Sequence, residues 1–394
     1  MLHKIFLKKN EERRLKAGHL WVYSNEIDIQ KSPLKDCVPG ELVALFSSSN
    51  KPLGVGYINP NTLLCVRLLS RDEHQAVDVN FFKEKIQNAL ALRSLLFSKP
   101  YYRLVYGESD FLPGVVIDRF GETVVIQINT AGMEALKDLL LDAVMQVLSP
   151  KVVVWRNDSG ARAVEGLENY VSVAFGDTPE TIQLEENGVS FQAPLLTGQK
   201  TAWFYDHRLN RARLENYVKG KRVLDVFSYL GAWGIQALKF GAKAVVSIDS
   251  SSDAIEQQRK NAELNQVQDQ LQLITADAFQ ALKDLIKAGE KFDVVIVDPP
   301  AFIKRRKDIK EGMKAYFHLN DLALKLLNNS GLLVSASCSQ HLEESDLLDL
   351  IRSSGLQNGY TLQVLERGHQ GPDHPLHFSI PETEYLKALF IFKA

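Results

Sequence analysis

The sequence predicts a multidomain fold in which a small β-rich unit and an α+β unit precede an α/β domain built on a parallel sheet. First, the chain of 394 residues is longer than one ordinary hydrophobic core sustains. Second, short strand-like runs separated by turns fill the N-terminal part, whereas strands alternate with helices after about residue 185. We therefore expect three domains, at residues 1–72, 73–185 and 186–394.

The composition favours a soluble globular protein, since 45% of the residues are hydrophobic and 24% are charged. No apolar run approaches the roughly 20 residues that cross a bilayer, and the start of the chain lacks a signal-peptide pattern. Cys37, Cys65 and Cys338 are too far apart in sequence for a disulfide framework or a CxxC metal site. We expect a cytoplasmic protein with reduced thiols, no metal site and no membrane association.

The first two predicted domains are described by their strand and helix patterns. The β-rich unit has three strand patterns bounded by turn residues, at 41–48, 52–58 and 63–70. The α+β unit begins with a helical pattern at about 80–97, followed by strands at 112–121 and 123–130, one amphipathic helix at 132–148 and a strand at 151–157. We expect the two strands on either side of Gly121 to pair with each other.

The third predicted domain repeats an apolar strand that ends in a polar or acidic residue. Such strands lie within 222–226, 244–249, 271–277, 292–298 and 331–339, with helical segments between them. This alternation implies right-handed crossovers and a doubly wound parallel sheet. Ligands bind at the carboxyl ends of strands in such sheets. The candidate cofactor residues at these ends are Asp225, Ser228, Tyr229, Gly231, Asp249, Asp277, Ala278 and Asp298.

The chemistry of these strand ends indicates S-adenosylmethionine. The acid Asp249 suits a ribose diol, and Asp277 beside the apolar Ala278 suits the amine of adenine. An acid in the first strand, Asp225, with a glycine turn after it, suits a zwitterionic tail. Bulky residues replace the glycines that a pyrophosphate-binding turn needs, so a dinucleotide is not expected. For any one of these aspartates, a helix cap is the alternative role.

The motif VDPPAF, which ends the fourth strand, and Cys338, which follows the fifth, indicate the reacting end of the site. Prolines stiffen the loop and leave carbonyl oxygens free for a planar substrate, and Asp298 can bond a base. The C5 atom of a pyrimidine is a poor nucleophile. Addition of the Cys338 thiolate to C6 would activate it, because a thiolate is a soft nucleophile and a good leaving group. A small buried structural cysteine is the alternative.

These motifs resemble those of a known family. DVFSYLGAWG, SIDSS, DAF, VDPPAF and SASCS, preceded by TGQKTAWFYDHRLNR at 197–211, resemble the bacterial large-subunit ribosomal RNA 5-methylcytosine methyltransferases that carry an N-terminal PUA domain. The resemblance covers essentially the whole chain. It implies a PUA-like RNA-binding unit, an α+β connector, a Rossmann-like class I methyltransferase domain and methylation of cytosine C5 in 23S rRNA. It also implies Cys338 as nucleophile and S-adenosylmethionine as cofactor, with cofactor contacts around Ser228, Asp249, Asp277 and Asp298. We also expect Asp298 to belong to the catalytic site.

The chain departs from better-known RNA cytosine methyltransferases at one position. Those enzymes carry a second cysteine in the loop where this chain has Ala301, and that cysteine helps to release the product. Another base or water must then remove the C5 proton, and no residue in the sequence identifies it. Tyr205, Asp206, His207 and Arg208 follow the GQKT segment at 198–201, where they could approach the base or the methyl donor. Asp206 and Arg208 could equally form a structural ion pair.

An RNA substrate implies several contact residues in this chain. The flipped or single-stranded target base is expected beside Pro299, Pro300, Phe302 and Arg208, with phosphates near Lys304 and Arg305. The basic run at 4–16 is a second candidate for phosphate contact, and a solvated face is the alternative for both basic runs. Trp203 and Phe204 could stack on the base or belong to the core.

Two further functions fit the pattern. A guanine-nitrogen methyltransferase would leave Cys338 structural, and a non-catalytic RNA-binding or assembly factor would transfer no methyl group. A homodimer is compatible with the resemblance, but no apolar stripe in the sequence requires one.

Overall fold

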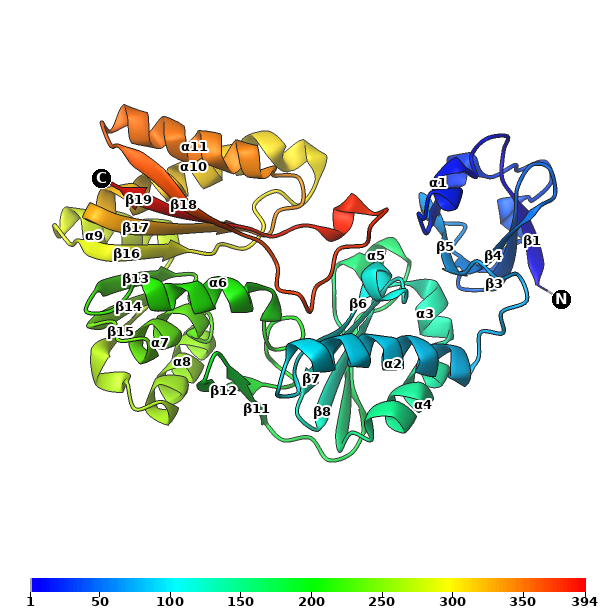
Figure 1. Ribbon diagram of the computed structural model, residues 1–394, viewed down its shortest axis with the longest axis horizontal. Coiled ribbons are helices and arrows are strands. Elements are labelled where there is room, and N and C mark those ends of the chain that lie inside the picture. Colours follow the sequence, from blue (N-terminus) through cyan, green and yellow to red (C-terminus); the bar gives the residue numbers. More distant parts are fainter. Residues whose placement is uncertain (1) are drawn as a thin grey trace. The chain divides into compact units, whose positions relative to one another are not determined.

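The computed structural model describes residues 2–394, which divide into two compact units (Figure 1). The first unit consists of Met1–Ile182, Pro194–Trp203 and Pro372–Thr383. The second consists of Gln183–Ala193, Phe204–Gly371 and Glu384–Ala394. The chain therefore passes repeatedly from one unit to the other. The division into three domains stays a prediction.

The N-terminal part of the first unit is a five-stranded sheet in the order β1-β3-β4-β5-β2. Its strands are β1 (His3–Phe6), β2 (Trp21–Tyr23), β3 (Leu42–Phe46), β4 (Pro52–Ile58) and β5 (Leu64–Ser70), and the short helix α1 (Arg13–Lys16) precedes β2. The three predicted strands are confirmed as β3, β4 and β5. In β3, the alternate residues Val43 and Leu45 are fully buried in one core, as expected for a sheet with one covered face.

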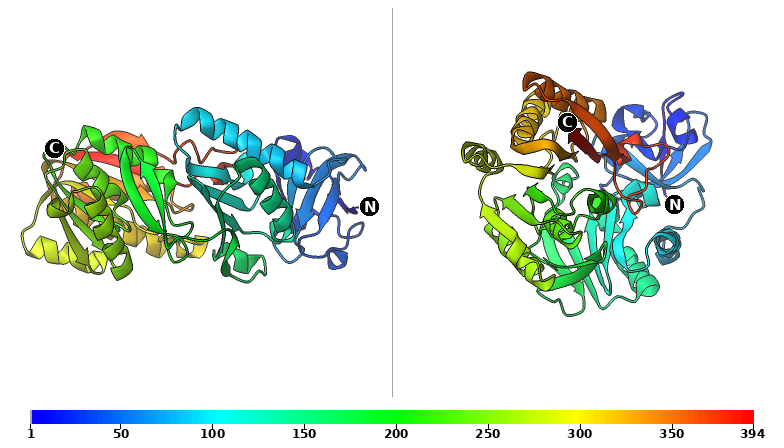
Figure 2. Two further views of the ribbon diagram at one scale, coloured as in Figure 1. Left: turned by 90° about the horizontal axis from the view of Figure 1, so that it is seen from below. Right: turned by 60° about the vertical axis from the view of Figure 1, so that its left-hand side comes forward.

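A second five-stranded sheet, in the order β10-β9-β8-β7-β6, forms the rest of the first unit (Figure 2). Its strands are β6 (Tyr101–Tyr106), β7 (Val115–Phe120), β8 (Thr123–Ile128), β9 (Val152–Asn157) and β10 (Tyr170–Phe175). The predicted pairing across Gly121 is confirmed, because β7 and β8 are antiparallel neighbours. Helix α2 (Val79–Leu96) packs on β6 and on α4 (Lys137–Leu148).

The prediction of a single helix at 132–148 is wrong. The structure has α3 (Ala131–Ala135) and then α4, with a non-helical residue, Leu136, between them. The Cα of Gly132 in α3 lies so close to the Tyr57 ring that a Cβ there would be 2.1 Å from it. The break lets α3 press against Tyr57 of β4 while α4 packs on α2. Sequence periodicity does not reveal such a break, because both halves keep the same helical spacing.

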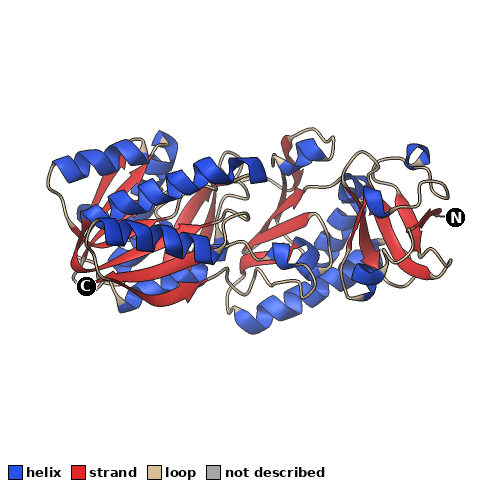
Figure 3. Cartoon of the chain, turned by 90° about the horizontal axis from the view of Figure 1, so that it is seen from above, coloured by secondary structure: helices blue, strands red, loops and turns tan. Residues whose placement is uncertain are grey.

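The second unit contains a seven-stranded sheet in the order β15-β14-β13-β16-β17-β19-β18 (Figures 1 and 3). Five strands are parallel, namely β13 (Arg222–Val226), β14 (Ala244–Asp249), β15 (Leu271–Thr275), β16 (Phe292–Val297) and β17 (Leu327–Ser337). The last strand of the chain, β19 (Lys387–Lys393), inserts antiparallel between β17 and β18 (Leu362–Gly368). The predicted parallel sheet is confirmed, and its antiparallel edge is an addition.

Helices surround this sheet. Those on one face, α9 (Ala278–Lys287), α10 (Ile309–Leu326) and α11 (Glu344–Gln357), share a core with its strands. Helices α7 (Ala232–Lys239) and α8 (Ser252–Leu264) contact β13, β14 and β15, and α6 (Arg208–Arg213) packs on α7. The ribbon β11 (Thr181–Glu186) and β12 (Val189–Pro194) precedes them, and α5 (Ala161–Val164) lies in the first unit. No helix within residues 2–394 is long and apolar enough to cross a membrane.

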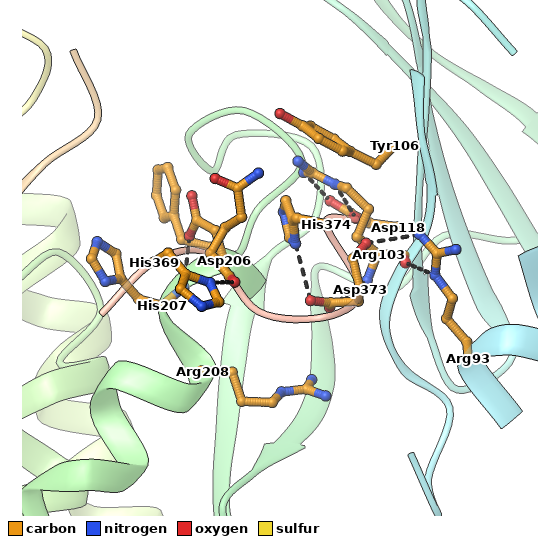
Figure 4. A network of polar contacts seen from close by, with 12 residues as sticks. Arg93, Arg103, Tyr106, Asp118, Asp206, His207, Arg208, His369, Asp373 and His374 are labelled. Carbon is orange, nitrogen blue, oxygen red and sulfur yellow. Dashed lines mark hydrogen bonds and ion pairs between the residues drawn. The ribbon is translucent and has the colours of Figure 1, made fainter. Parts of the chain in front are cut away.

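The segment Pro372–Thr383, called the strap below, returns to the first unit and is held there by buried polar contacts (Figure 4). Arg93, which is fully buried, donates to both carboxylate oxygens of Asp110 at 2.5 and 2.7 Å and to the Asp373 carbonyl at 2.8 Å. The Arg103 backbone amide donates to Asp373 Oδ2 at 3.1 Å. The sequence contains no local sign of this return, because its contacts join residues 270 or more positions apart.

Candidate active site

The loop after β13 has an unusual backbone. Phe227, Tyr229 and Gly231 all have positive φ, at +65°, +47° and +84°. Asp225 is fully buried behind this loop, where its Oδ2 accepts the Gly234 amide hydrogen of α7 at 2.9 Å. Burial raises the pKa of Asp225 to about 7, against the opposing effect of the Gly234 hydrogen bond. Asp225 therefore connects the loop to α7 through this hydrogen bond. A direct contact between Asp225 and a cofactor stays a prediction.

Asp249, at the end of β14, is the acid best placed for a ligand. Its Oδ2 accepts the Tyr229 amide hydrogen at 2.8 Å and its Oδ1 accepts that of Ser251 at 2.9 Å. The side chain is only half-buried, and each carboxylate oxygen retains a lone pair. Ser228, by contrast, is buried and donates to Gln258 Oε1 at 2.9 Å. Asp249 can thus bind a diol, while Ser228 supports the loop.

Asp277 forms the helix cap that the sequence left open as its alternative role. It is exposed at the N-cap of α9 and accepts the Gln280 amide hydrogen at 3.0 Å. Its neighbour Ala278 is buried. The cap uses one oxygen of the carboxylate, so the exposed remainder still fits the exocyclic amine of adenine. The carboxylates of Asp249 and Asp277 accept hydrogen bonds, and no glycine-rich phosphate-binding turn accompanies them. This combination fits S-adenosylmethionine.

Asp298, which follows β16, is held on both sides by aromatic donors. Its Oδ2 accepts from Trp233 Nε1 at 3.0 Å, and its Oδ1 lies 3.2 Å from His207 Nε2. Burial alone would raise the pKa of Asp298. The electrostatic effect of His207 and the hydrogen bonds from His207 and Trp233 outweigh burial, so the pKa lies below its ordinary value. Asp298 is therefore an ionised acceptor with a defined orientation.

The proton on His207 follows from its other neighbour. Asn210 Nδ2 lies 3.1 Å from His207 Nδ1, and an amide nitrogen can only donate. The orientation of this amide is consistent with its other bonds, because Asn210 Oδ1 accepts from Arg213 and Nδ2 donates to the His369 carbonyl. Nδ1 therefore accepts, and the Nε2 hydrogen points to Asp298. Figure 4 shows His207 beside Asp206 and His369.

Cys338 lies in a loop that its two neighbouring serines hold in place. Ser337 Oγ donates to the buried Tyr316 hydroxyl at 2.8 Å, and the Ser339 Oγ is 2.9 Å from the same hydroxyl. Ser339 Oγ also accepts the Ile303 amide hydrogen at 3.1 Å. This bond ties the Cys338 loop to the loop of Asp298. Cys338 itself is half-buried, while Ser337 and Ser339 are fully buried.

A half-buried lysine lies near Cys338. Lys387 of β19 donates to the carbonyls of Ser339 at 2.8 Å and Tyr385 at 2.9 Å. Burial lowers the pKa of Lys387, and the charges of Glu343 and Cys338 act against this. The sequence alone does not indicate Lys387, because only the insertion of β19 beside β17 brings it to this loop. The β17–β19 register, which pairs Lys387 with Ser337, places the lysine beside Cys338.

The predicted substrate-contact residues differ in accessibility. Pro300 and the side chains of Lys304 and Arg305 are exposed, whereas Pro299 is buried. Phe302 is half-buried in an aromatic cluster with Tyr316, at 4.9 Å between ring centroids, so it packs in the core rather than standing free. Arg305 pairs with Asp308 at 3.1 Å on the surface. These contacts stay predictions.

Two other predicted contact residues are buried. Arg208 lies 3.7 Å from Glu186 and 5.0 Å from the centroid of the Tyr205 ring. With 7% of its surface exposed, Arg208 supports the start of α6, and a direct contact with the substrate would require it to move. Trp203 is 1% exposed, which confirms its core role and excludes stacking on an incoming base.

The basic run at the N-terminus is divided between structural and exposed side chains. Arg14 donates to Glu26 at 2.6 Å and lies 5.0 Å from the Tyr23 ring centroid, so it stabilises the β-rich sheet. Lys9 and Arg13 are exposed. In the same sheet, ligand atoms of His3, Cys37 and Glu41 lie within 4.8 Å of one another, a cluster that the cysteine spacing did not predict. Burial, and then Glu41, raises the pKa of Cys37 to about 11.

Acid-bearing strand ends meet at one edge of a parallel sheet, next to a proline-stiffened loop, and this fold and site define the class of S-adenosylmethionine-dependent methyltransferases. Two family models match the chain. That of the S-adenosylmethionine-dependent methyltransferases matches residues 165–380, and that of the PUA-like domain matches residues 5–71. S-adenosylmethionine is therefore the cofactor of the second unit.

Curated relatives identify the family more closely. A ribosomal RNA large subunit methyltransferase I from Aliivibrio fischeri is 36% identical over 97% of each chain, and one from Aeromonas salmonicida is 35% identical over 98%. A solved structure from Streptococcus mutans, described as a SAM-dependent methyltransferase, has the same fold, with a TM-score of 0.84 at 24% identity over 99% of this chain and 100% of that one. The chain belongs to the ribosomal RNA large subunit methyltransferase I family.

Proposed function

We propose that the protein methylates C5 of a cytosine in large-subunit ribosomal RNA through a covalent bond between Cys338 and C6 of the base. The observation that carries this proposal is the position of Cys338. Its thiol is half-buried between two buried, hydrogen-bonded serines, and Ser339 joins its loop to that of Asp298. A purely structural cysteine needs no such arrangement, because it packs in the core as Cys65 does at 1% exposure.

The proposed reaction has two stages at the pyrimidine. The Cys338 thiolate forms a bond to C6, and the electrons of the C5–C6 double bond become available at C5. When bound, S-adenosylmethionine supplies the methyl group that C5 receives. Loss of the C5 proton to a base then restores the double bond and expels the thiolate. Balance therefore requires one proton acceptor, which the alanine at position 301 cannot be.

Asp298 orients the base in this proposal. An ionised carboxylate accepts hydrogen bonds from the cytosine amino group, and Trp233 and His207 prevent it from rotating away. Asp249 and Asp277 bind the ribose and the adenine of the cofactor. The exposed Lys304 and Arg305, which follow the Asp298 loop, contact phosphates, which position the RNA without reading its sequence.

The test is methyl transfer from labelled S-adenosylmethionine to unmodified large-subunit rRNA, followed by nucleoside mass spectrometry. We expect 5-methylcytosine from the wild-type protein and none from Cys338→Ala. Cys65→Ala is the matched control, because Cys65 is buried in the N-terminal sheet, and it should retain activity. A substrate with 5-fluorocytosine, which cannot lose a C5 proton, should leave a covalent protein–RNA complex with wild type only.

Other outcomes select the alternatives. Methylguanine as product, with full activity of Cys338→Ala, would contradict the proposal and assign Cys338 a structural role. Absence of any methylated nucleoside with both rRNA and ribosomal particles would favour a binding or assembly factor.

A further inference from the structure

A hollow of about 610 Å³ lies entirely within the first unit. Three parts of that unit line it, namely the β-rich sheet through Leu68 and Arg71, the α+β part through Lys85 and Phe111, and the strap through Leu376 and Phe378. Its volume is within the range of small-molecule sites, roughly 300–1,000 Å³. None of the predicted methyl-transfer residues lines it.

The rim of this hollow exposes large apolar side chains. Phe378 is 104% exposed, Leu376 is 53% exposed and Phe111 is 51% exposed. Phe111 also adopts the left-handed backbone conformation, with φ of +59°, which is costly for a bulky residue. A fully exposed phenylalanine gains nothing from burial in the folded chain. Grouped apolar side chains on a surface indicate a binding site.

The strap holds Phe378 in a fixed position, because it is anchored on both sides. Before Phe378, Asp373 is held by Arg93 and Arg103. After it, Ile380 is fully buried in the core of the β-rich sheet, and Ser379 Oγ donates to the Ala17 carbonyl at 2.8 Å. The residue that follows Ala17 is Gly18. A Cβ atom at this position would lie 2.3 Å from Ser379 Oγ.

Two cations border the same hollow. Arg71 is exposed, and its guanidinium is oriented by donating to the Leu15 and His19 carbonyls at 2.5 and 3.2 Å. Lys85 is half-buried, with its ammonium 5.4 Å from the Phe81 ring centroid. Asp72 is the one acid among the lining residues. Exposed rings for stacking with adjacent cations for phosphates are the pattern that proteins use for single-stranded nucleic acid.

We propose that this hollow binds one unpaired nucleotide of the RNA substrate, with its base stacked on Phe378 and its phosphate beside Arg71 and Lys85. This inference rests on the proposed function, since it requires an RNA substrate. It assigns the strap, which is far from the N-terminal sheet in sequence, a part in the RNA-binding surface of the first unit.

The experiment compares the binding of unmodified large-subunit rRNA transcript by the full chain and by Phe378→Ala. Loss of one stacked base should weaken binding by about 5- to 100-fold. The thermal unfolding midpoint should not change, because the removed ring is fully exposed. Phe175→Ala is the matched control, a partly exposed phenylalanine of the same unit on β10 that does not line the hollow, and it should bind as wild type does.

A gain-of-signal variant makes the test independent of activity. In Phe378→Trp, stacking should preserve affinity, and the added indole fluorescence should be quenched when the transcript binds.

At saturating rRNA, Phe378→Ala should retain the wild-type kcat, with the loss confined to KM.

The outcomes separate this inference from the proposed function. If wild type neither binds nor methylates rRNA, the proposed function fails first. If wild type binds and Phe378→Ala binds equally well, the nucleotide site is contradicted. Unchanged binding of naked rRNA, combined with weaker methylation of ribosomal particles, would instead identify a ribosomal protein as the occupant.

Discussion

At the scale of single residues, the defining feature of the site is a carboxylate whose charge is preserved in spite of burial. Asp298 and Asp225 lie at the ends of adjacent strands, yet burial raises the pKa of Asp225 to about 7 while the pKa of Asp298 falls below its ordinary value. The difference comes from the hydrogen-bond partners of the two carboxylates. Asp298 has His207 and Trp233, whereas Asp225 Oδ1 has no hydrogen-bond partner among the described residues.

The pair of Asp298 and His207 predicts a pH effect. In His207→Gln the electrostatic effect of the imidazole is lost and burial remains, so the pKa of Asp298 should rise. The proposed role of Asp298 requires its ionised form, so activity should be lost as pH falls through its pKa. The acid limb of the kcat profile should therefore move to higher pH, and kcat at neutral pH should fall by about 10-fold or more.

The measurement is the pH dependence of kcat for the two proteins, with S-adenosylmethionine affinity as the control for folding. An unchanged acid limb in His207→Gln would contradict the role of His207 in keeping Asp298 ionised. The same pKa shift has a stability consequence of defined sign. A lowered carboxyl pKa stabilises the folded state above the unfolded pKa, and this contribution disappears as pH falls through the folded pKa.

At the scale of elements, the antiparallel strand β19 brings a lysine to the loop that follows β17. By inserting beside β17 it places Lys387 opposite Ser337, one residue before Cys338. A nearby cation favours a thiolate over a thiol. The serine–tyrosine contacts around Tyr316 and the lysine therefore act on the same loop from two elements, α10 and β19.

This arrangement predicts slower thiol chemistry in Lys387→Met. Alkylation of Cys338 by iodoacetamide at neutral pH should be slower by about 3- to 10-fold, because the cation is removed while the side-chain volume is retained. Lys393→Met is the matched control, since Lys393 lies on the same strand and donates to the Leu324 and Leu327 carbonyls instead. Equal alkylation rates in wild type and Lys387→Met would exclude an electrostatic role for Lys387.

At the scale of the whole molecule, the two compact units are interleaved along the chain. The strap belongs to the first unit, although the strands on either side of it, β18 and β19, belong to the sheet of the second. A buried arginine holds the strap, and Arg93 is bonded both to Asp110 and to the Asp373 backbone. The folding of the first unit therefore depends on residues near the end of the chain.

This topology predicts a local effect of Asp373→Ala. The variant loses the carboxylate that accepts from the Arg103 amide and lies 3.0 Å from His374 Nδ1, while Arg93 keeps its ion pair with Asp110. Hydrogen exchange should accelerate at residues 374–382. The affinity of Asp373→Ala for rRNA should fall, as expected for Phe378→Ala. Exchange in the sheet of the second unit should not change. Uniform acceleration across the chain would indicate global destabilisation instead.

The sequence alone determined the features that depend on local pattern. Alternation of strands and helices predicted the parallel sheet, and the acids at strand ends predicted where Asp249, Asp277 and Asp298 lie relative to one another. The position of Cys338 after an apolar strand predicted a loop at the same edge of the sheet. These predictions succeed because side-chain period and strand direction are set by neighbouring residues.

The tertiary structure decided what depends on contacts between distant residues. It pairs His207 with Asp298 and Lys387 with the Cys338 loop. It buries Arg208 beside Glu186, pairs Arg14 with Glu26, and returns the strap to the first unit. No local period encodes these contacts, because the partners lie 12 to 280 residues apart and the packing of separate elements brings them together. The sequence thus located the candidate reacting groups at one edge of the sheet, and long-range packing decided their charge, their orientation and the shape of the surface around them.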